Sequence, residues 1–160
     1  MTSMAQGRRI SRDTPLAELT LRKYEKPSVD GRELVRKMCL SLGLLQPGDS
    51  RDVVVDVFQT LLKSGEALTS VEVERKVIKA REEAGLELLG IAPSNIRRQL
   101  LRLRDLFLVE KKGNYYRIAE DAPLTELFQE KLESYLLDAT VKRVKEYLKA
   151  VDKAYPRSEE

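Results

Sequence analysis

The chain has 160 residues, of which 42% are hydrophobic and 34% are charged, with 29 basic and 26 acidic side chains. This length fits one ordinary domain with terminal additions, and the apolar share suffices for a core. A single cysteine and no histidine exclude intramolecular disulfides, histidine metal ligands and histidine-based catalysis. Because no carboxylate cluster or glycine-rich phosphate loop stands at a telling spacing either, we expect no enzyme, no cofactor and no metal site.

No segment predicts contact with a membrane or secretion. No run approaches the roughly 18 uninterrupted apolar residues of a membrane-spanning helix, and the polar start MTSMAQGRRISRD lacks the apolar core of a secretion signal. We therefore expect a cytoplasmic protein. Cys39 stands at an apolar-periodic position between Met38 and Leu40, which predicts a buried side chain rather than a reactive thiol.

Residues 1–27 predict a flexible basic arm. The segment is polar, shows little periodicity and contains Pro15 and Pro27, and its basic residues are Arg8, Arg9, Arg12, Arg22, Lys23 and Lys26. Such a terminus serves either as a solubilising tail or as an arm that contacts DNA. The sequence leaves both interpretations open.

Two helices are expected next. The first begins after Asp30, whose carboxylate is a suitable N-cap, and it stops at Gly43. The second covers about 51–64 after Ser50 as the N-cap. Its run Val53-Val54-Val55 also suits a strand, but apolar residues at helical spacing favour a helix.

A third helix is expected from Thr69 to Gly85. Thr69 with Glu72 three residues later forms a capping-box pattern. The connection LELLGIA then leads to Pro93, which is acceptable in a first helical turn because its missing N–H has no partner to lose there.

The helix expected at 93–106 is amphipathic. Its apolar stripe, expected to face the core, consists of Ile96, Leu100, Leu103 and Phe107. An α-helix fits the major groove of B-DNA, where arginine contacts guanine and asparagine contacts adenine. The predicted base readers are therefore the polar residues near its N-terminus, Ser94, Asn95, Arg97 and Arg98.

Three further residues of this helix are predicted to contribute to binding. Leu101 lies amid the polar face, where it contacts a thymine methyl group or packs on a protein partner. Arg102 and Arg104 lie further along the helix and are assigned to phosphates, which position a protein on DNA without reading its sequence.

A β-hairpin is expected at 108–118. A two-residue Gly113-Asn114 loop places Lys112 opposite Tyr115. The pairs that follow along the two strands are Lys111–Tyr116, Glu110–Arg117 and Val109–Ile118. This register matches an apolar pair and an opposite-charge pair. It places Lys111, Lys112 and Asn114 at or beside the tip as further candidates for DNA contact.

Positive charge is concentrated in this part of the chain. Residues 91–118 contain seven basic and two acidic residues, an excess of five, whereas the whole chain has an excess of only three. A local excess is what a phosphate-binding surface requires.

Three helices, the third of them basic, followed by a two-stranded hairpin resemble the winged helix-turn-helix domain of bacterial and archaeal transcription regulators. The resemblance covers residues 51–119 and rests on element order rather than on a diagnostic motif. It implies that the helix from Ser94 to Arg102 enters the major groove and that Lys111 and Lys112 of the hairpin, the wing, approach the backbone or minor groove. The connection LELLGIA is longer than the family's usual turn.

The C-terminal segment 120–155 predicts a long helix. Apolar residues recur at threes and fours from Leu124 to Leu148, with one irregular step near Asp138. The segment from Glu120 onward carries seven basic and ten acidic residues, which suits it poorly to DNA. Its stripe either packs back on the domain or pairs with a second subunit, and the length favours a homodimer on a palindromic site.

The sequence thus predicts a mainly α protein with a small β-hairpin, organised as a basic arm (1–27), a winged-helix DNA-binding domain (28–119) and a helical dimerisation segment (120–155). The predicted function is a sequence-specific, double-stranded DNA-binding transcription regulator. The alternative is a winged-helix module that docks on protein in a replication, transcription or RNA-processing assembly.

Overall fold

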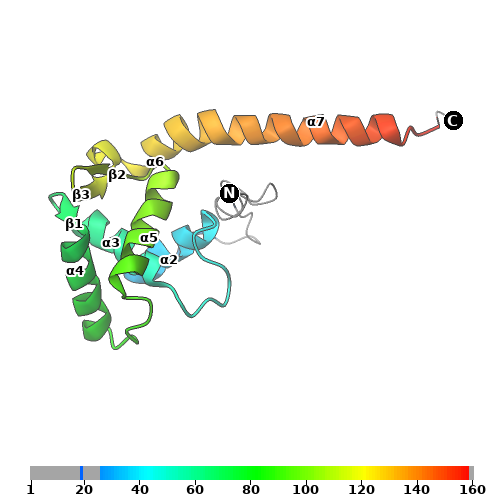
Figure 1. The fold of residues 1–160 in the computed structure, drawn as a ribbon. Coiled ribbons are helices and arrows are strands. Elements are labelled where there is room, and N and C mark those ends of the chain that lie inside the picture. The colour runs from blue at the N-terminus through cyan, green and yellow to red at the C-terminus, as the bar shows by residue number, and fades with distance from the viewer. Residues whose placement is uncertain (1–18, 20–25, 159–160) are drawn as a thin grey trace, which may run out of the picture. The chain divides into compact units, whose positions relative to one another are not determined.

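A computed structural model describes Leu19 and residues 26–158 (Figure 1). The predicted basic arm lies outside the described residues, apart from Leu19, Lys26 and Pro27. The described residues form a mainly helical protein with one three-stranded antiparallel sheet and a long C-terminal helix. They divide into two units, with the boundary between Ser50 and Arg51.

The first unit contains one described helix, α2 (Gly31–Ser41). Asp30 precedes it in extended conformation, but its side chain makes no capping hydrogen bond, so the predicted carboxylate cap is wrong. The predicted stop is confirmed: Gly43 adopts a φ of +73°, and the amide of Leu44 donates to the carbonyl of Cys39 over 2.9 Å. The Cys39 side chain is buried, as predicted.

The second unit is built on three helices that pack against one another, α3 (Val53–Lys63), α4 (Ser70–Glu83) and α5 (Pro93–Asp105). The valine run 53–55 is helical and buried. The helix begins after Asp52 rather than after the predicted Ser50. Fully buried side chains from all three helices form the core: Val55, Val57, Phe58, Val73, Val77, Ile96, Leu100 and Leu103.

Both ends of α4 follow the sequence prediction. The Thr69 hydroxyl accepts a hydrogen bond from the Glu72 amide over 3.2 Å, which satisfies one backbone donor of the first turn. At the other end Gly85 has a φ of +68°, and the Leu86 amide donates to the Arg81 carbonyl over 2.9 Å. The helix is therefore closed at each end by the residues that the sequence marks.

The sheet contains β1 (Leu68–Thr69), β2 (Val109–Lys112) and β3 (Tyr115–Ile118) in the order β1-β3-β2. The hairpin register is the predicted one, from Lys112 opposite Tyr115 to Val109 opposite Ile118. No sequence pattern predicts β1, because two residues are too few for alternation to appear. Its pairing with β3 ties the hairpin to the start of α4.

Phe107 does not belong to the core stripe of α5, contrary to the prediction. The helix ends at Asp105, and Phe107 adopts a φ of +61° and is 39% exposed. The amide of Leu108 donates to the carbonyl of Leu103 over 3.1 Å, a C-terminal closure that normally carries glycine at the left-handed position. This turn points Phe107 outward, and Leu106 and Leu108 are buried instead.

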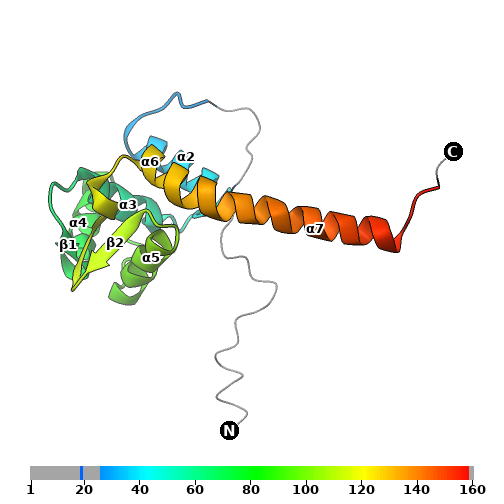
Figure 2. The same ribbon diagram turned by 90° about the horizontal axis from the view of Figure 1, so that it is seen from above.

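The C-terminal segment is helical from Leu124 to Ala154. A short 3-10 turn, η1 (Ala119–Asp121), leads into α6 (Leu124–Leu127), the π-helical η2 (Phe128–Leu137) and α7 (Asp138–Ala154). η2 ends at Leu137, just before the irregular step predicted near Asp138, which itself lies in the regular helix α7. The i→i+5 bonding of η2 matches the spacing of the buried residues Leu127 and Leu132. Both views show α7 extending beyond the other elements of its unit (Figures 1 and 2).

Candidate nucleic-acid interface

The connection between α4 and α5 is anchored by a buried arginine. Arg81 is 3% exposed, and its guanidinium donates to Asp56 over 2.6 Å and to Asp52 over 3.3 Å. Its Nε donates to the carbonyl of Glu87 over 2.7 Å. One side chain thus joins α3, α4 and the start of the connection, and it attaches this long segment to the core.

A second anchor holds the other end of the same connection. The Asn95 side-chain amide donates to the carbonyl of Gly90 over 2.7 Å. Gly90 has a φ of +75°, and a Cβ there would lie 3.0 Å from Asn95 Nδ2 and 3.3 Å from Val53 Cγ1. Glycine is therefore needed for both its backbone conformation and the close approach.

Asn95 also begins a row of polar contacts along α5. Its Oδ1 accepts from Gln99 over 3.1 Å, and the Gln99 oxygen accepts from Arg102 over 2.8 Å. Two predicted contact residues, Asn95 and Arg102, are thus half-buried and hydrogen-bonded inside the protein. Gln99, which the sequence analysis did not single out, links them, and the intervals of four and three residues were the signal for this row.

The other predicted residues of α5 lie on the surface. Leu101 is 50% exposed, and the other predicted residues of α5 that are exposed are Ser94, Arg97, Arg98 and Arg104. One exposed acidic residue, Asp105, ends the helix. Among the residues that the structure describes, none forms an ion pair with these three arginines. The face of α5 away from the core is therefore cationic, with one apolar side chain in it.

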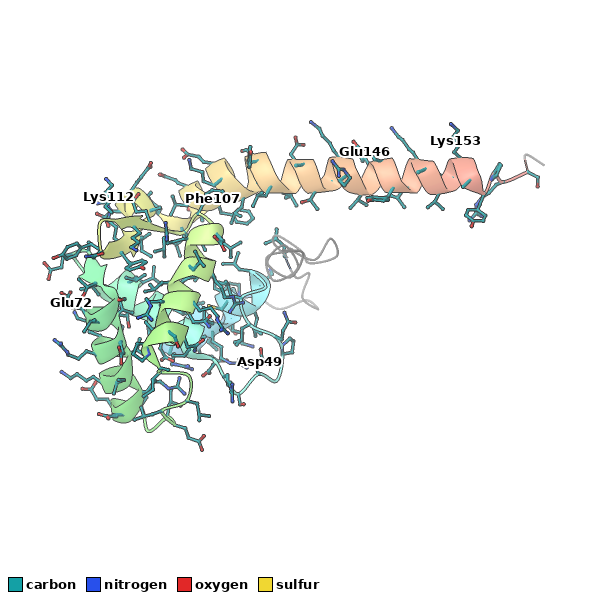
Figure 3. All side chains as sticks on the ribbon, in the orientation of Figure 1. Asp49, Glu72, Phe107, Lys112, Glu146 and Lys153 are labelled. Atoms are coloured by element: carbon teal, nitrogen blue, oxygen red, sulfur yellow. The ribbon has the colours of Figure 1, made fainter. Side chains whose placement is uncertain are left out.

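The hairpin tip is exposed and basic. Lys111, Lys112 and Asn114 all lie on the surface, and Figure 3 shows Lys112 at the edge of the molecule. The Lys111 ammonium lies 5.5 Å from the centre of the Tyr116 ring, within range of a cation–π contact. Tyr115, which the sequence analysis did not propose, is 51% exposed opposite Lys112.

Charge at the base of the hairpin is neutralised. Arg117 forms ion pairs with Glu110 and, over 3.1 Å, with Asp121. Burial by itself raises the pKa of Glu110, but the hydrogen bonds from Arg117 and from the Glu120 backbone and the charges of Arg117 and Lys112 outweigh it and lower that pKa. The hydrogen bond to Glu110 raises the pKa of Arg117 despite opposing desolvation. Arg117 is thus a structural cation.

The fold brings the basic face of α5 and the basic hairpin together. α5 packs directly against β2, and Figure 2 shows the hairpin and α5 side by side. We call the exposed side chains of this region the basic surface; it comprises Ser94, Arg97, Arg98, Leu101, Arg104, Lys111, Lys112 and Asn114.

Comparisons of the chain with protein-family models, curated proteins and solved structures found no match. Two further findings concern the described residues alone. None of their helices is both long and apolar enough to cross a membrane. No group of three or more histidine, cysteine, aspartate or glutamate side chains among them is placed to hold a metal ion.

Proposed function

We propose that residues 53–118 form a winged helix-turn-helix domain that binds double-stranded DNA and regulates transcription. The order of elements supports this assignment, since helix, short strand, two helices and a hairpin follow one another and β1 joins the sheet beside β3. In this proposal α5 enters the major groove, and the hairpin is the wing.

The observation that carries the proposal is the basic surface. Its five cations, Arg97, Arg98, Arg104, Lys111 and Lys112, come from two packed elements. None of them forms an ion pair with a described acidic residue, although the charge of Lys112 contributes to lowering the pKa of Glu110. A cluster of this kind neutralises phosphates, releases their counterions and gives binding that falls with salt. Asn95 and Arg102 support the helix from inside, so base reading falls to Ser94, Arg97 and Arg98.

Fluorescence anisotropy with a mixed-sequence duplex at increasing salt tests this proposal. If all five cations contact phosphates, the logarithm of the association constant falls by about 4 to 5 per logarithmic unit of salt. The double variant Arg98→Glu, Lys112→Glu should abolish binding. The control is a double variant on α7, Lys142→Glu with Lys149→Glu, which changes the net charge by the same amount. It should retain most of the DNA binding.

Leu101 favours a second candidate function, docking on a protein. Its half-exposed apolar side chain lies in the middle of a polar helix face, where it could pack on a partner. The same anisotropy measurement separates the two functions, because absence of DNA binding even at low salt supports docking and contradicts DNA recognition.

We also propose that the chain is a homodimer paired through α7. No residue of α7 is buried in the described structure, although the helix is strongly amphipathic. Sedimentation at micromolar concentration tests this, and a monomer contradicts it.

A further inference from the structure

The solvent-facing side of the sheet holds a small hollow. Successive side chains of a strand point to opposite faces, and Val109, Tyr116 and Ile118 are buried toward the core. On the opposite face lies a hollow of about 190 Å³, lined by Ala67, Glu110, Lys112, Tyr115 and Arg117. The hairpin therefore offers a site of its own, apart from the side that packs on the core.

The small side chain of Ala67 leaves this space open. Ala67 directly precedes β1, and extending the antiparallel register of β1 with β3 by one residue places it beside Arg117. A methyl group there covers little of the neighbouring side chains. The space between Tyr115 and Arg117 is therefore not filled by the protein itself.

The lining has three kinds of group that hold a nucleotide. Tyr115 is exposed and offers a ring on which a base can stack. Lys112, labelled in Figure 3, is exposed opposite it and suits a phosphate. Glu110 accepts hydrogen bonds from Arg117 and from the Glu120 amide. Because a carboxylate has about four acceptor sites, Glu110 can still accept from the amino group of a base.

The dimensions of the hollow match a single base. Its volume lies below the roughly 300 to 1,000 Å³ of sites for drug-sized ligands. Tyr115 and Arg117 are two residues apart on β3, which is about 7 Å at ~3.4 Å per residue. Bases stack at about 3.4 Å, so this interval admits one flat ring between the tyrosine ring and the guanidinium, both of which stack on bases.

We propose that the outer face of the hairpin holds one unpaired base of the bound DNA, stacked on Tyr115, with Lys112 at the adjoining phosphate. A paired base cannot enter, because its faces are covered by its neighbours in the duplex. The occupant is a base of a strand, not a free nucleotide, since the hollow takes the ring alone and Lys112 connects it to the basic surface. The chain therefore binds a duplex that adjoins unpaired bases more tightly than a fully paired one. This inference rests on the DNA binding proposed above.

Fluorescence anisotropy with the full-length chain at constant salt tests the inference. It compares a blunt duplex with the same duplex carrying a short unpaired stretch at the 3′ end, at the 5′ end or in a central bubble. The tightest of the three interrupted duplexes should bind roughly 5- to 100-fold more tightly than the blunt one, the gain that stacking of one base supplies. An unpaired stretch of abasic sugars keeps the phosphates, and it should lose this gain.

Substitutions assign the gain to one side chain. Tyr115→Ala should bind the interrupted and blunt duplexes equally, with unchanged affinity for the blunt one, whereas Tyr115→Phe keeps the ring and should keep the gain. Tyr135→Ala on η2, an equally exposed tyrosine outside the hairpin, is the matched control and should change neither affinity. In the unaltered chain, irradiation of 5-iodouracil at the unpaired position should cross-link it to Tyr115, which mass spectrometry locates.

The outcomes separate this inference from the proposed function. Equal affinity of the unaltered chain for blunt and interrupted duplexes overturns the inference and leaves DNA binding standing. A gain that survives Tyr115→Ala or the abasic substitution overturns it too, as does loss of the gain to micromolar free nucleoside monophosphates. The cross-link needs no variant, so its absence from Tyr115 overturns the inference even if Tyr115→Ala fails to fold. Absence of binding to every duplex at low salt contradicts the proposed function and the inference together.

Discussion

Asn95 on the first turn of α5 donates its side-chain amide to the carbonyl of Gly90, 2.7 Å away in the connection that precedes the helix. Because Arg81 holds the same connection at Glu87, a segment that is long for a turn between two helices is attached to the core at two points. The start of α5 is therefore fixed, and with it the direction of the arginines behind it.

Replacing Gly90 by alanine should destabilise the second unit. The φ of +75° is unfavourable for an L-residue by about 1 to 2 kcal/mol, and the new Cβ would approach Asn95 Nδ2 to 3.0 Å. Urea unfolding measures the loss. Gly65→Ala is the matched control, since a Cβ there meets no atom within 4 Å and φ is not positive; equal effects of the two variants would contradict the role assigned to Gly90.

Arg81→Met should lower the free energy of unfolding by about 3 to 5 kcal/mol, because it removes the guanidinium that pairs with the buried Asp56 carboxylate over 2.6 Å. Thermal unfolding checks this value. Changing Asp56 to leucine in the same chain should recover part of the loss, since an apolar pair replaces the ion pair. Arg75→Met, on the exposed side of α4, should change stability by less than about 0.5 kcal/mol.

Arg98→Ala and Lys112→Ala should affect DNA binding differently. Loss of a base contact by Arg98 weakens binding to the preferred site by about 1 to 3 kcal/mol and relaxes sequence preference. Loss of Lys112 weakens binding to all sequences alike and reduces the salt dependence by about one unit. The preferred site is first obtained by selecting bound fragments from random DNA, and anisotropy then measures the affinity of each variant for that site and for random DNA. Equal effects of the two substitutions on both kinds of DNA would refute the separate roles assigned to Arg98 and Lys112.

The ion pair at the hairpin base predicts a specific pH dependence. Since the pKa of Glu110 in the folded chain lies below its ordinary value of 4.5, ionised Glu110 stabilises the fold above that value, and the contribution is lost as pH falls through the lowered pKa. The difference in stability between the unaltered chain and Glu110→Gln should therefore be present at about pH 7 and absent at about pH 2. Glu133→Gln, an exposed carboxylate on η2, should show little difference at either pH.

Local patterns in the sequence determined the helices of the second unit and the hairpin register. Thr69 with Glu72 marked the start of α4 because that cap depends on neighbouring residues alone. The pairing of Glu110 with Arg117 followed from a two-residue loop, since loop length fixes which residues face each other.

Tertiary contacts decided the remainder. β1 exists because β3 lies beside Leu68 and Thr69. A two-residue strand has no periodicity from which it could be predicted. Phe107 points outward because the backbone closure at the end of α5 needs a left-handed residue at that position, and the burial of Leu106 and Leu108 beside it takes the place predicted for Phe107. The inward turn of Asn95 likewise depends on the carbonyl of Gly90 arriving beside it. The sequence alone therefore defined which residues are basic and helical, and the fold decided which of them point to solvent, because packing rather than periodicity determines where each side chain finds a partner.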